Sequence, residues 1–164
     1  MTDQDMFTEL TQRQIFALRG SNVRLSLLSV SVPTLPAPLL EYAVRGASAS
    51  HDVVGPLKDG SIGLFSIESD GTAGTEHRFL VNLQNVLTPI AKRQDIGIIR
   101  FRAVHRWACE LTDAFDLFDS LFDAPALLLT IRRPPSSSPT PTRLPLRHAA
   151  PPMYSRFGDQ LKSA

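Results

Sequence analysis

The amino-acid sequence predicts an α/β fold, an α+β sandwich in which helices pack on a central mixed sheet that contains a hairpin. Three observations support this fold class. Apolar and polar residues alternate in several short stretches, as they do in strands, and apolar residues recur at helical spacing between those stretches. Helical and strand patterns therefore alternate along the chain. An Asp-Gly pair between two apolar runs adds one hairpin.

The composition excludes several classes of protein. The formal net charge of the 164 residues is +1, so no overall field predicts nucleic acid or a membrane as a partner. The single cysteine, Cys109, leaves no disulfide framework within the chain. No apolar run approaches the roughly 20 residues of a membrane span, and the acidic N-terminus does not resemble a secretory signal. We expect a soluble, cytoplasmic protein.

The chain divides into three parts. Residues 1–20 hold an N-terminal helix, 21–133 form a single α/β domain, and 134–164 form a tail rich in proline and serine. Seven of the 13 prolines lie in this tail, so it cannot bury enough apolar surface to offset chain entropy, and we expect it to be disordered. Two interpretations of the tail stay open: an idle terminus, or a docking segment with a small cluster of Met153, Tyr154 and Phe157 near its end.

The first elements are a helix, a strand and a short helix. A helix is predicted from Phe7 to Leu18, after polar residues 1–5 that we expect to be frayed. It is either a lid on the core or a dimer arm. The strand from Val23 to Val32 changes its apolar phase midway, which indicates a bulge or burial on both faces. Pro38 then opens a short helix that ends near Gly46.

The hairpin lies between His51 and Ser69. Its turn is Lys58-Asp59-Gly60, and an Asp-Gly turn of this kind is expected to place both residues at positive φ. The apolar phase also shifts after the turn, so we expect the second strand to pack on both faces and to lie inside the sheet.

Two helices and two strands follow the hairpin. Thr75 is the expected N-cap of a helix that runs to Ile90. Thr112 is the expected N-cap of a helix with Phe115, Phe118 and Phe122 on one face, joined by Leu117 and Leu121. Strands are predicted at 98–107 and 126–131. The residues expected to be buried together are Leu64, Ile67, Phe79, Leu83, Val86, Phe101 and Trp107.

The run VRGASASHDVVGPLKDGSIGLF resembles the centre of GGDEF domains, the diguanylate cyclases. In that family an arginine ends a helix, an aspartate starts a strand, and the signature Gly-Gly-Asp-Glu-Phe lies on a hairpin turn. Aligned from Asp52, the signature positions are Lys58, Asp59, Gly60, Ser61 and Ile62. The resemblance covers about residues 23–90. It implies a nucleotidyl-cyclase-like sheet with the hairpin at its centre.

The departures from the family concern its chemistry. Gly60 and Ser61 replace the signature acids that serve metal binding and catalysis. The first strand, VRLSLLSVSVPT, lacks the second metal-binding aspartate expected at its end. Without carboxylates Mg²⁺ has no hard ligands, and phosphoryl transfer loses the ions that neutralise developing charge. The resemblance therefore implies a degenerate, non-catalytic member that serves signalling as a regulatory or protein-interaction module. The alternative is an enzyme or nucleotide-binding protein with an unrecognised site.

Two groups of residues are candidates for ligand binding. Lys58, Asp59, Gly60 and Ser61 form either a phosphate-holding nest or a plain turn. On one face of the strand 98–107, three arginines are suited to a phosphate or an acidic partner, or form a solvated face. They are Arg100, Arg102 and Arg106.

No metal, cofactor or catalytic group is predicted. His105 and Cys109 are four residues apart, whereas zinc needs about four ligands. No Ser-His-Asp or Cys-His arrangement is apparent in the sequence. We expect a protein partner, which includes a second copy of the chain in a homodimer.

Overall fold

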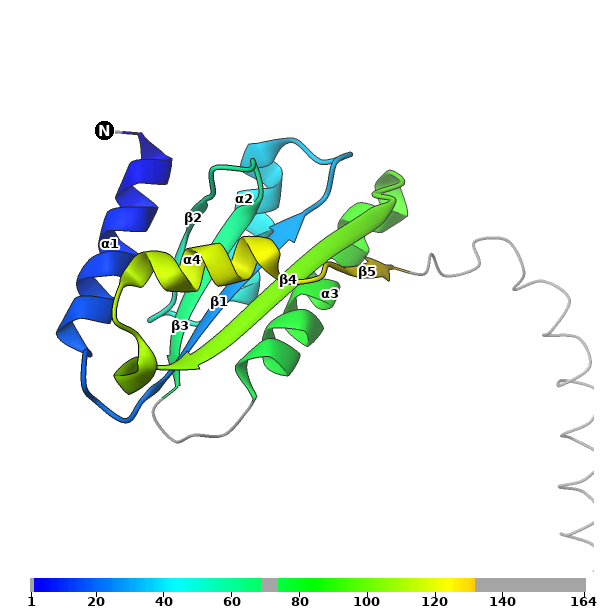
Figure 1. The fold of residues 1–164 in the computed structure, drawn as a ribbon. Helices are drawn as coiled ribbons and strands as arrows, with labels where there is room; N and C mark the ends of the chain where they lie inside the picture. Colours follow the sequence, from blue (N-terminus) through cyan, green and yellow to red (C-terminus); the bar gives the residue numbers. More distant parts are fainter. Residues whose placement is uncertain (1, 69–73, 132–164) are drawn as a thin grey trace, which may run out of the picture. The chain divides into compact units, whose positions relative to one another are not determined.

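A five-stranded antiparallel sheet lies between helices on both of its faces (Figure 1). The structure, a computed structural model, describes residues 2–68 and 74–131. The predictions for 134–164 lie outside these residues. The elements are α1 (Asp3–Ala17), β1 (Arg24–Ser31), α2 (Ala37–Ala47), β2 (Val53–Pro56), β3 (Ile62–Glu68), α3 (Thr75–Arg93), β4 (Ile98–Trp107), the 3₁₀ turn η1 (Ala108–Glu110), α4 (Ala114–Asp123) and β5 (Leu127–Thr130).

The sheet order is β2-β3-β1-β4-β5, and every pair of neighbouring strands is antiparallel. From β1 to β4 the elements follow the order βαββαβ of a split βαβ unit. The α+β fold class is confirmed, but the expected mixed sheet is wrong. The crossover through α2 returns β2 parallel to β1, yet β3 lies between them, so no parallel pair forms. The central strand is β1, not the hairpin.

Strand β1 is buried on both faces and contains no bulge. Its pairing runs without interruption from Arg24 to Val30 along β3 and from Arg24 to Ser31 along β4. Leu28 and Val30 face the layer of α2 and α3, whereas Leu25 and Leu27 face α1 and α4. The shift of apolar phase in the sequence therefore reflects two covered faces.

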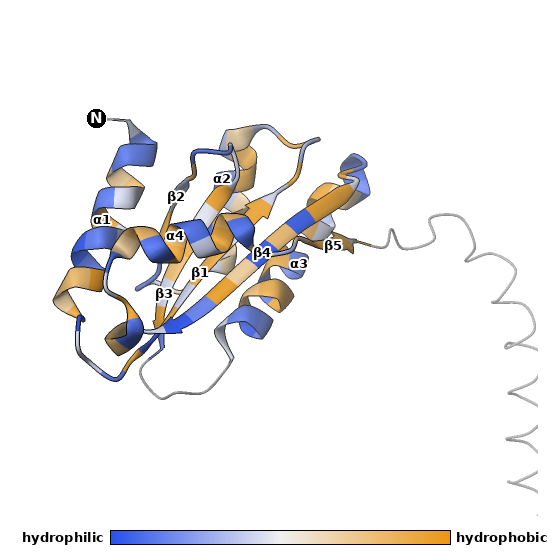
Figure 2. Cartoon of the chain, viewed as in Figure 1, coloured by the Kyte–Doolittle hydropathy of each residue, from blue (hydrophilic) through white to orange (hydrophobic). Residues whose placement is uncertain are grey.

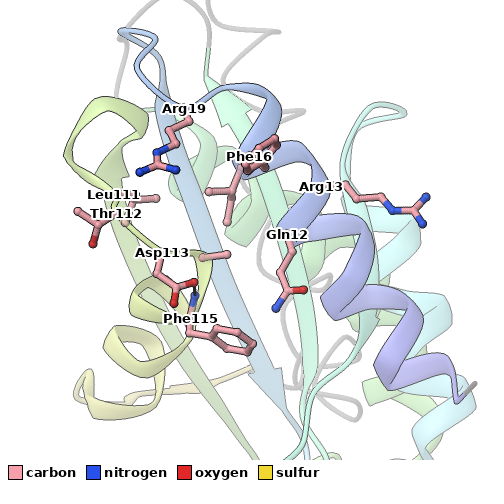
Figure 3. A pocket seen from close by; sticks show the side chains of 10 residues that line it. Gln12, Arg13, Phe16, Arg19, Leu111, Thr112, Asp113 and Phe115 are labelled. Atoms are coloured by element: carbon pink, nitrogen blue, oxygen red, sulfur yellow. Dashed lines mark hydrogen bonds between the residues drawn. The ribbon is translucent and has the colours of Figure 1, made fainter.

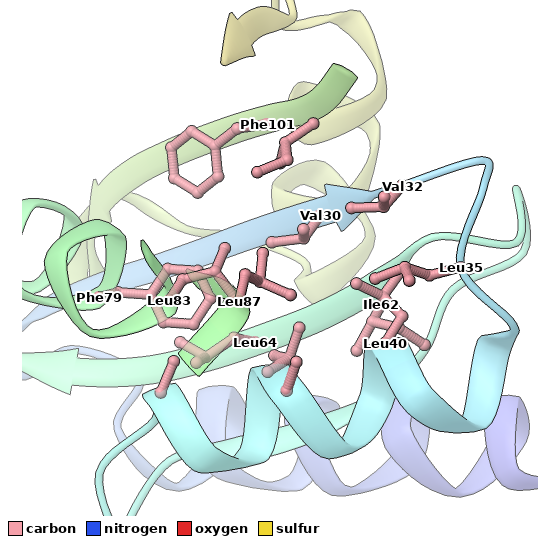
Figure 4. Packing of buried hydrophobic residues seen from close by; sticks show 14 of the residues in the cluster. Val30, Val32, Leu35, Leu40, Ile62, Leu64, Phe79, Leu83, Leu87 and Phe101 are labelled. Atoms are coloured by element: carbon pink, nitrogen blue, oxygen red, sulfur yellow. The ribbon is translucent and has the colours of Figure 1, made fainter. Parts of the chain in front are cut away.

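The core beneath α2 and α3 contains Phe79 and Phe101, whose stacked rings have centroids 6.3 Å apart (Figure 4). Leu64 and Leu83 are buried with them, and Val86 packs there partly buried. The predicted core is wrong for two residues. Ile67 lies on the opposite face, because it is three residues from Leu64 along a strand, and Trp107 ends β4 outside both clusters.

The core beneath α1 and α4 depends on two glycines. Phe7 of α1 is buried over β2 and β3. A Cβ atom added to Gly55 would lie 2.6 Å from Phe7 Cβ, and one added to Gly63 would lie 2.8 Å from Phe7 Cε1. Both distances are shorter than van der Waals contact. Helix α1 is therefore a lid on this face of the sheet.

Helix α1 begins earlier than its apolar pattern predicts. Thr2 and Asp5 form a capping box, in which the Asp5 N–H donates to Thr2 Oγ1 at 3.2 Å and the Thr2 N–H donates to Asp5 Oδ2 at 3.0 Å. The hydrogen bonds from the Thr2 side chain and backbone lower the pKa of the Asp5 carboxyl. The expectation that residues 1–5 are frayed is thus wrong for residues 2–5.

Two helix starts also differ from the sequence prediction. Gly74 is the N-cap residue of α3, and Thr75 is already inside the helix. At α4 the N-cap is Asp113, whose carboxylate accepts from the Phe115 N–H at 3.1 Å. The buried residues of α4 are Leu117, Phe118 and Leu121, which belong to the predicted apolar face, whereas Phe115 of that face is exposed.

None of the helices in the described ranges is long and apolar enough to cross a membrane.

Candidate functional site

The hairpin turn is a three-residue loop. The Leu57 N–H donates to Ser61 O at 2.8 Å, and the Gly60 N–H donates to Leu57 O at 3.0 Å. Gly60 has a φ of +84°, whereas no described residue other than glycine has a positive φ. The expected positive φ at Asp59 is therefore wrong. Hairpin loops of three residues combine a type I turn with a left-handed residue, and only that last residue needs positive φ.

Both carboxylate oxygens of Asp59 face partners from the domain itself. Oδ1 accepts from the Ser61 N–H at 3.0 Å and from the Ser61 hydroxyl at 2.5 Å. Oδ2 lies 3.9 Å from Nη1 of Arg102, and both side chains are about one-third exposed. Asp59 thus stabilises the turn locally and links it to β4.

The structure brings only part of the predicted site together. Arg100 and Arg102 lie opposite Ser31 and Ser29, at the end of β1 that is nearest the turn. Arg106 shares their face but lies at the other end of β4, where Nη1 donates to the His105 carbonyl at 2.9 Å. Because β4 holds Arg106 away from the turn, the three arginines do not form one anion site.

The Lys58 side chain turns toward α4. Its Nζ lies 4.5 Å from the centroid of the Phe122 ring, a cation–π contact. The turn is therefore tied to α4 by Lys58 and to β4 by Asp59.

The arrangement around the turn differs from a two-carboxylate metal site. β1 ends in Ser31 and continues into Val32, and neither can supply a carboxylate. The one carboxylate at the turn, that of Asp59, already faces a guanidinium. Within residues 2–68 and 74–131, no three His, Cys, Asp or Glu side chains converge in a way that could hold a metal ion.

A second polar cluster lies at the opposite end of the sheet, beneath the start of α3. Nδ1 of His105 lies 2.8 Å from Ser26 Oγ, and Nε2 lies 2.8 Å from Glu76 Oε2. An ionised carboxylate only accepts, so Nε2 of His105 is the donor to Glu76. This chain of contacts joins β1, β4 and α3.

Glu68 extends the same cluster. It is 7% exposed, and its Oε1 accepts from the Thr75 N–H at 3.3 Å and lies 3.4 Å from Ser26 Oγ. Its Oε2 has no hydrogen bond but lies 3.8 Å from Nε of Arg24. The carboxylate thereby anchors the first turn of α3 to the sheet.

The order Ser26, His105 and Glu76 resembles a nucleophile, base and acid, an arrangement that was not apparent in the sequence. Ser26, however, has no exposed surface. A substrate cannot reach its hydroxyl in this structure. The contacts among these three residues instead hold β1, β4 and α3 together. The sequence contained one signal of this cluster: His105 is a polar residue on a face of β4 that is otherwise apolar.

A groove of about 450 Å³ lies between α1 and the segment that leads into α4 (Figure 3). Phe16 from α1 is 75% exposed, and Phe115 from α4 is 55% exposed. Ile15 and Leu111 form buried parts of the lining, and Arg13, Arg19 and Asp113 place charges around it. The sequence prediction missed this groove because it placed Phe115 on one face of its helix with Phe118 and Phe122, and Phe118 is buried.

Comparison of the chain with protein-family models, with curated proteins and with solved structures finds no match.

Proposed function

We propose that this domain is a non-catalytic, degenerate GGDEF-like module that regulates a signalling process through protein contacts. The observation that carries the protein-contact part is the exposure of two phenylalanines, Phe16 and Phe115, on two helices that line one groove. Exposed aromatic side chains beside a groove are typical of protein interaction sites.

Three features support the non-catalytic part of the proposal. The turn positions that match the signature acids are Gly60 and Ser61. The Asp59 carboxylate is used by Ser61 and faces Arg102. The hairpin lies beside the end of β1, where the resemblance places the second acid, and Ser31 stands there.

Photo-crosslinking tests the proposed function. A photoreactive phenylalanine analogue is placed at Phe16 in the full chain. The protein is expressed and irradiated in cells of its source organism, and the crosslinked adducts are identified by mass spectrometry. The matched control places the analogue at Tyr42, which is 71% exposed on α2. We expect a discrete adduct with one protein from position 16 and none from position 42. Equal labelling at both positions, or no adduct from either, would contradict the proposal.

A further inference from the structure

The two edges of the sheet differ in how they are protected. At one edge, β2 contains Pro56, the Arg45 guanidinium donates to the Val54 carbonyl at 3.1 Å, and α1 lies alongside (Figure 1). Both edge strands have four residues, but a proline and a covering element, two devices that block edge-to-edge pairing, are found at β2. At the other edge, β5 reads Leu-Leu-Leu-Thr and carries neither a charge nor a proline.

The apolar side chains of β5 are exposed on both faces of the sheet. Leu127 pairs with Phe101 and Leu128 pairs with Arg100, so the two leucines lie on opposite faces. They are 50% and 60% exposed, and Figure 2 shows β5 as an apolar segment. A helix docked on one face would cover only one of these leucines. A strand added beyond β5 would lie beside both.

The charge next to this edge selects the partner. Arg100 is exposed on the same face as Leu128, and its guanidinium has no hydrogen bond or ion pair with any residue that the structure describes. A strand added beyond β5 would lie two strand spacings, about 10 Å, from β4. An arginine that extends over Leu128 can meet a carboxylate at that distance, because both side chains are long.

We propose that β5 is a strand-addition site for an extended segment of a partner protein in which apolar and acidic residues alternate. The backbone edge supplies affinity, and Arg100 favours acidic over basic side chains. This proposal rests on the protein-interaction function above, but it concerns a different surface from the Phe16 groove.

The test uses the full chain and a labelled, blocked hexapeptide, acetyl-Val-Glu-Val-Glu-Val-Glu-amide, with binding measured by fluorescence anisotropy. The basic control peptide replaces each glutamate with lysine. We expect the acidic peptide to bind at least tenfold more tightly than the basic one, and Arg100→Glu to weaken its binding at least tenfold. The matched control Arg78→Glu, at an exposed position of α3, should leave binding unchanged.

NMR chemical shifts of the backbone amides locate the bound peptide, since strand addition should move the resonances of β5 more than those of α1. Equal binding of both peptides, or no effect of Arg100→Glu, would overturn the proposal. Self-association that Leu128→Glu abolishes, without peptide binding, would overturn it and assign the edge to a second copy of the chain. If the peptide fails to bind while position 16 still captures a protein, strand addition fails and the proposed function stands.

Discussion

At the residue scale, His105 connects three elements through its two ring nitrogens, to Ser26 and to Glu76. Replacing it with alanine leaves the Ser26 hydroxyl without that partner at a fully buried position. We expect His105→Ala to lower the free energy of unfolding by about 1–3 kcal/mol, measured by urea denaturation. His77→Ala, at an exposed position of α3, is the control and should change it by less than about 0.5 kcal/mol. Equal losses in both variants would show that the contacts of His105 are unimportant.

Phe101 is the residue that best tests the core beneath α2 and α3. It is 1% exposed and stacks on Phe79. Truncation to alanine should cost about 3–5 kcal/mol of stability, because it removes the ring and leaves a cavity. Phe16→Ala removes an equal volume from an exposed position and should cost less than about 0.5 kcal/mol. A loss below about 1 kcal/mol for Phe101→Ala would be inconsistent with this core.

At the level of the helices and strands, the close packing of α1 on the sheet predicts that two Gly→Ala substitutions, at Gly63 and at Gly46, have opposite effects on stability. Gly63→Ala places a Cβ 2.8 Å from Phe7 and 3.0 Å from Leu57, so it should destabilise the protein by about 1–3 kcal/mol. Gly46→Ala, within α2, meets only Val86 at 3.5 Å and should be neutral or stabilise by up to about 1 kcal/mol, because alanine favours helix. Thermal melting distinguishes them. If Gly63→Ala is as harmless as Gly46→Ala, α1 does not pack on the sheet through Phe7.

Patterns of neighbouring residues predicted the helices and strands, but they did not predict every helix cap or every exposed position. The strand 98–107 and the helix starting at Thr75 were predicted because alternation and helical spacing are properties of neighbouring residues. The capping box of α1 was missed because Thr2 and Asp5 were interpreted only as polar residues. The apolar face of α4 was predicted correctly for its buried residues, Leu117, Phe118 and Leu121, but Phe115 at the start of the helix is exposed.

Only the parts of the candidate site whose residues are close together in the sequence could be predicted. The turn 58–61 was identified from its own residues, but its partner Arg102 comes from β4 and depends on strand pairing. Ser26 and His105 are 79 positions apart and meet only because β1 and β4 are neighbours. The order of the strands, which a single sequence does not encode locally, therefore decides which polar residues form a cluster.

At the scale of the whole molecule, the domain should fold without its C-terminal segment. The sequence predicts that residues 134–164 contribute no core, and both cores lie within residues 2–131. A chain that ends at Arg133 should melt within about 4 °C of the full chain, since a change of 1 kcal/mol shifts a domain of this size by only a few degrees. Differential scanning calorimetry measures this, and a much lower melting temperature would place the domain boundary further along the chain.

We propose that the hairpin turn does not serve nucleotide chemistry and that the domain acts through protein contacts. Isothermal titration calorimetry of the full chain with GTP and Mg²⁺ tests it most directly. With Gly60 and Ser61 at the signature positions and Asp59 facing Arg102, we expect no heat beyond that of dilution. Tight binding of GTP that requires Mg²⁺ would contradict it.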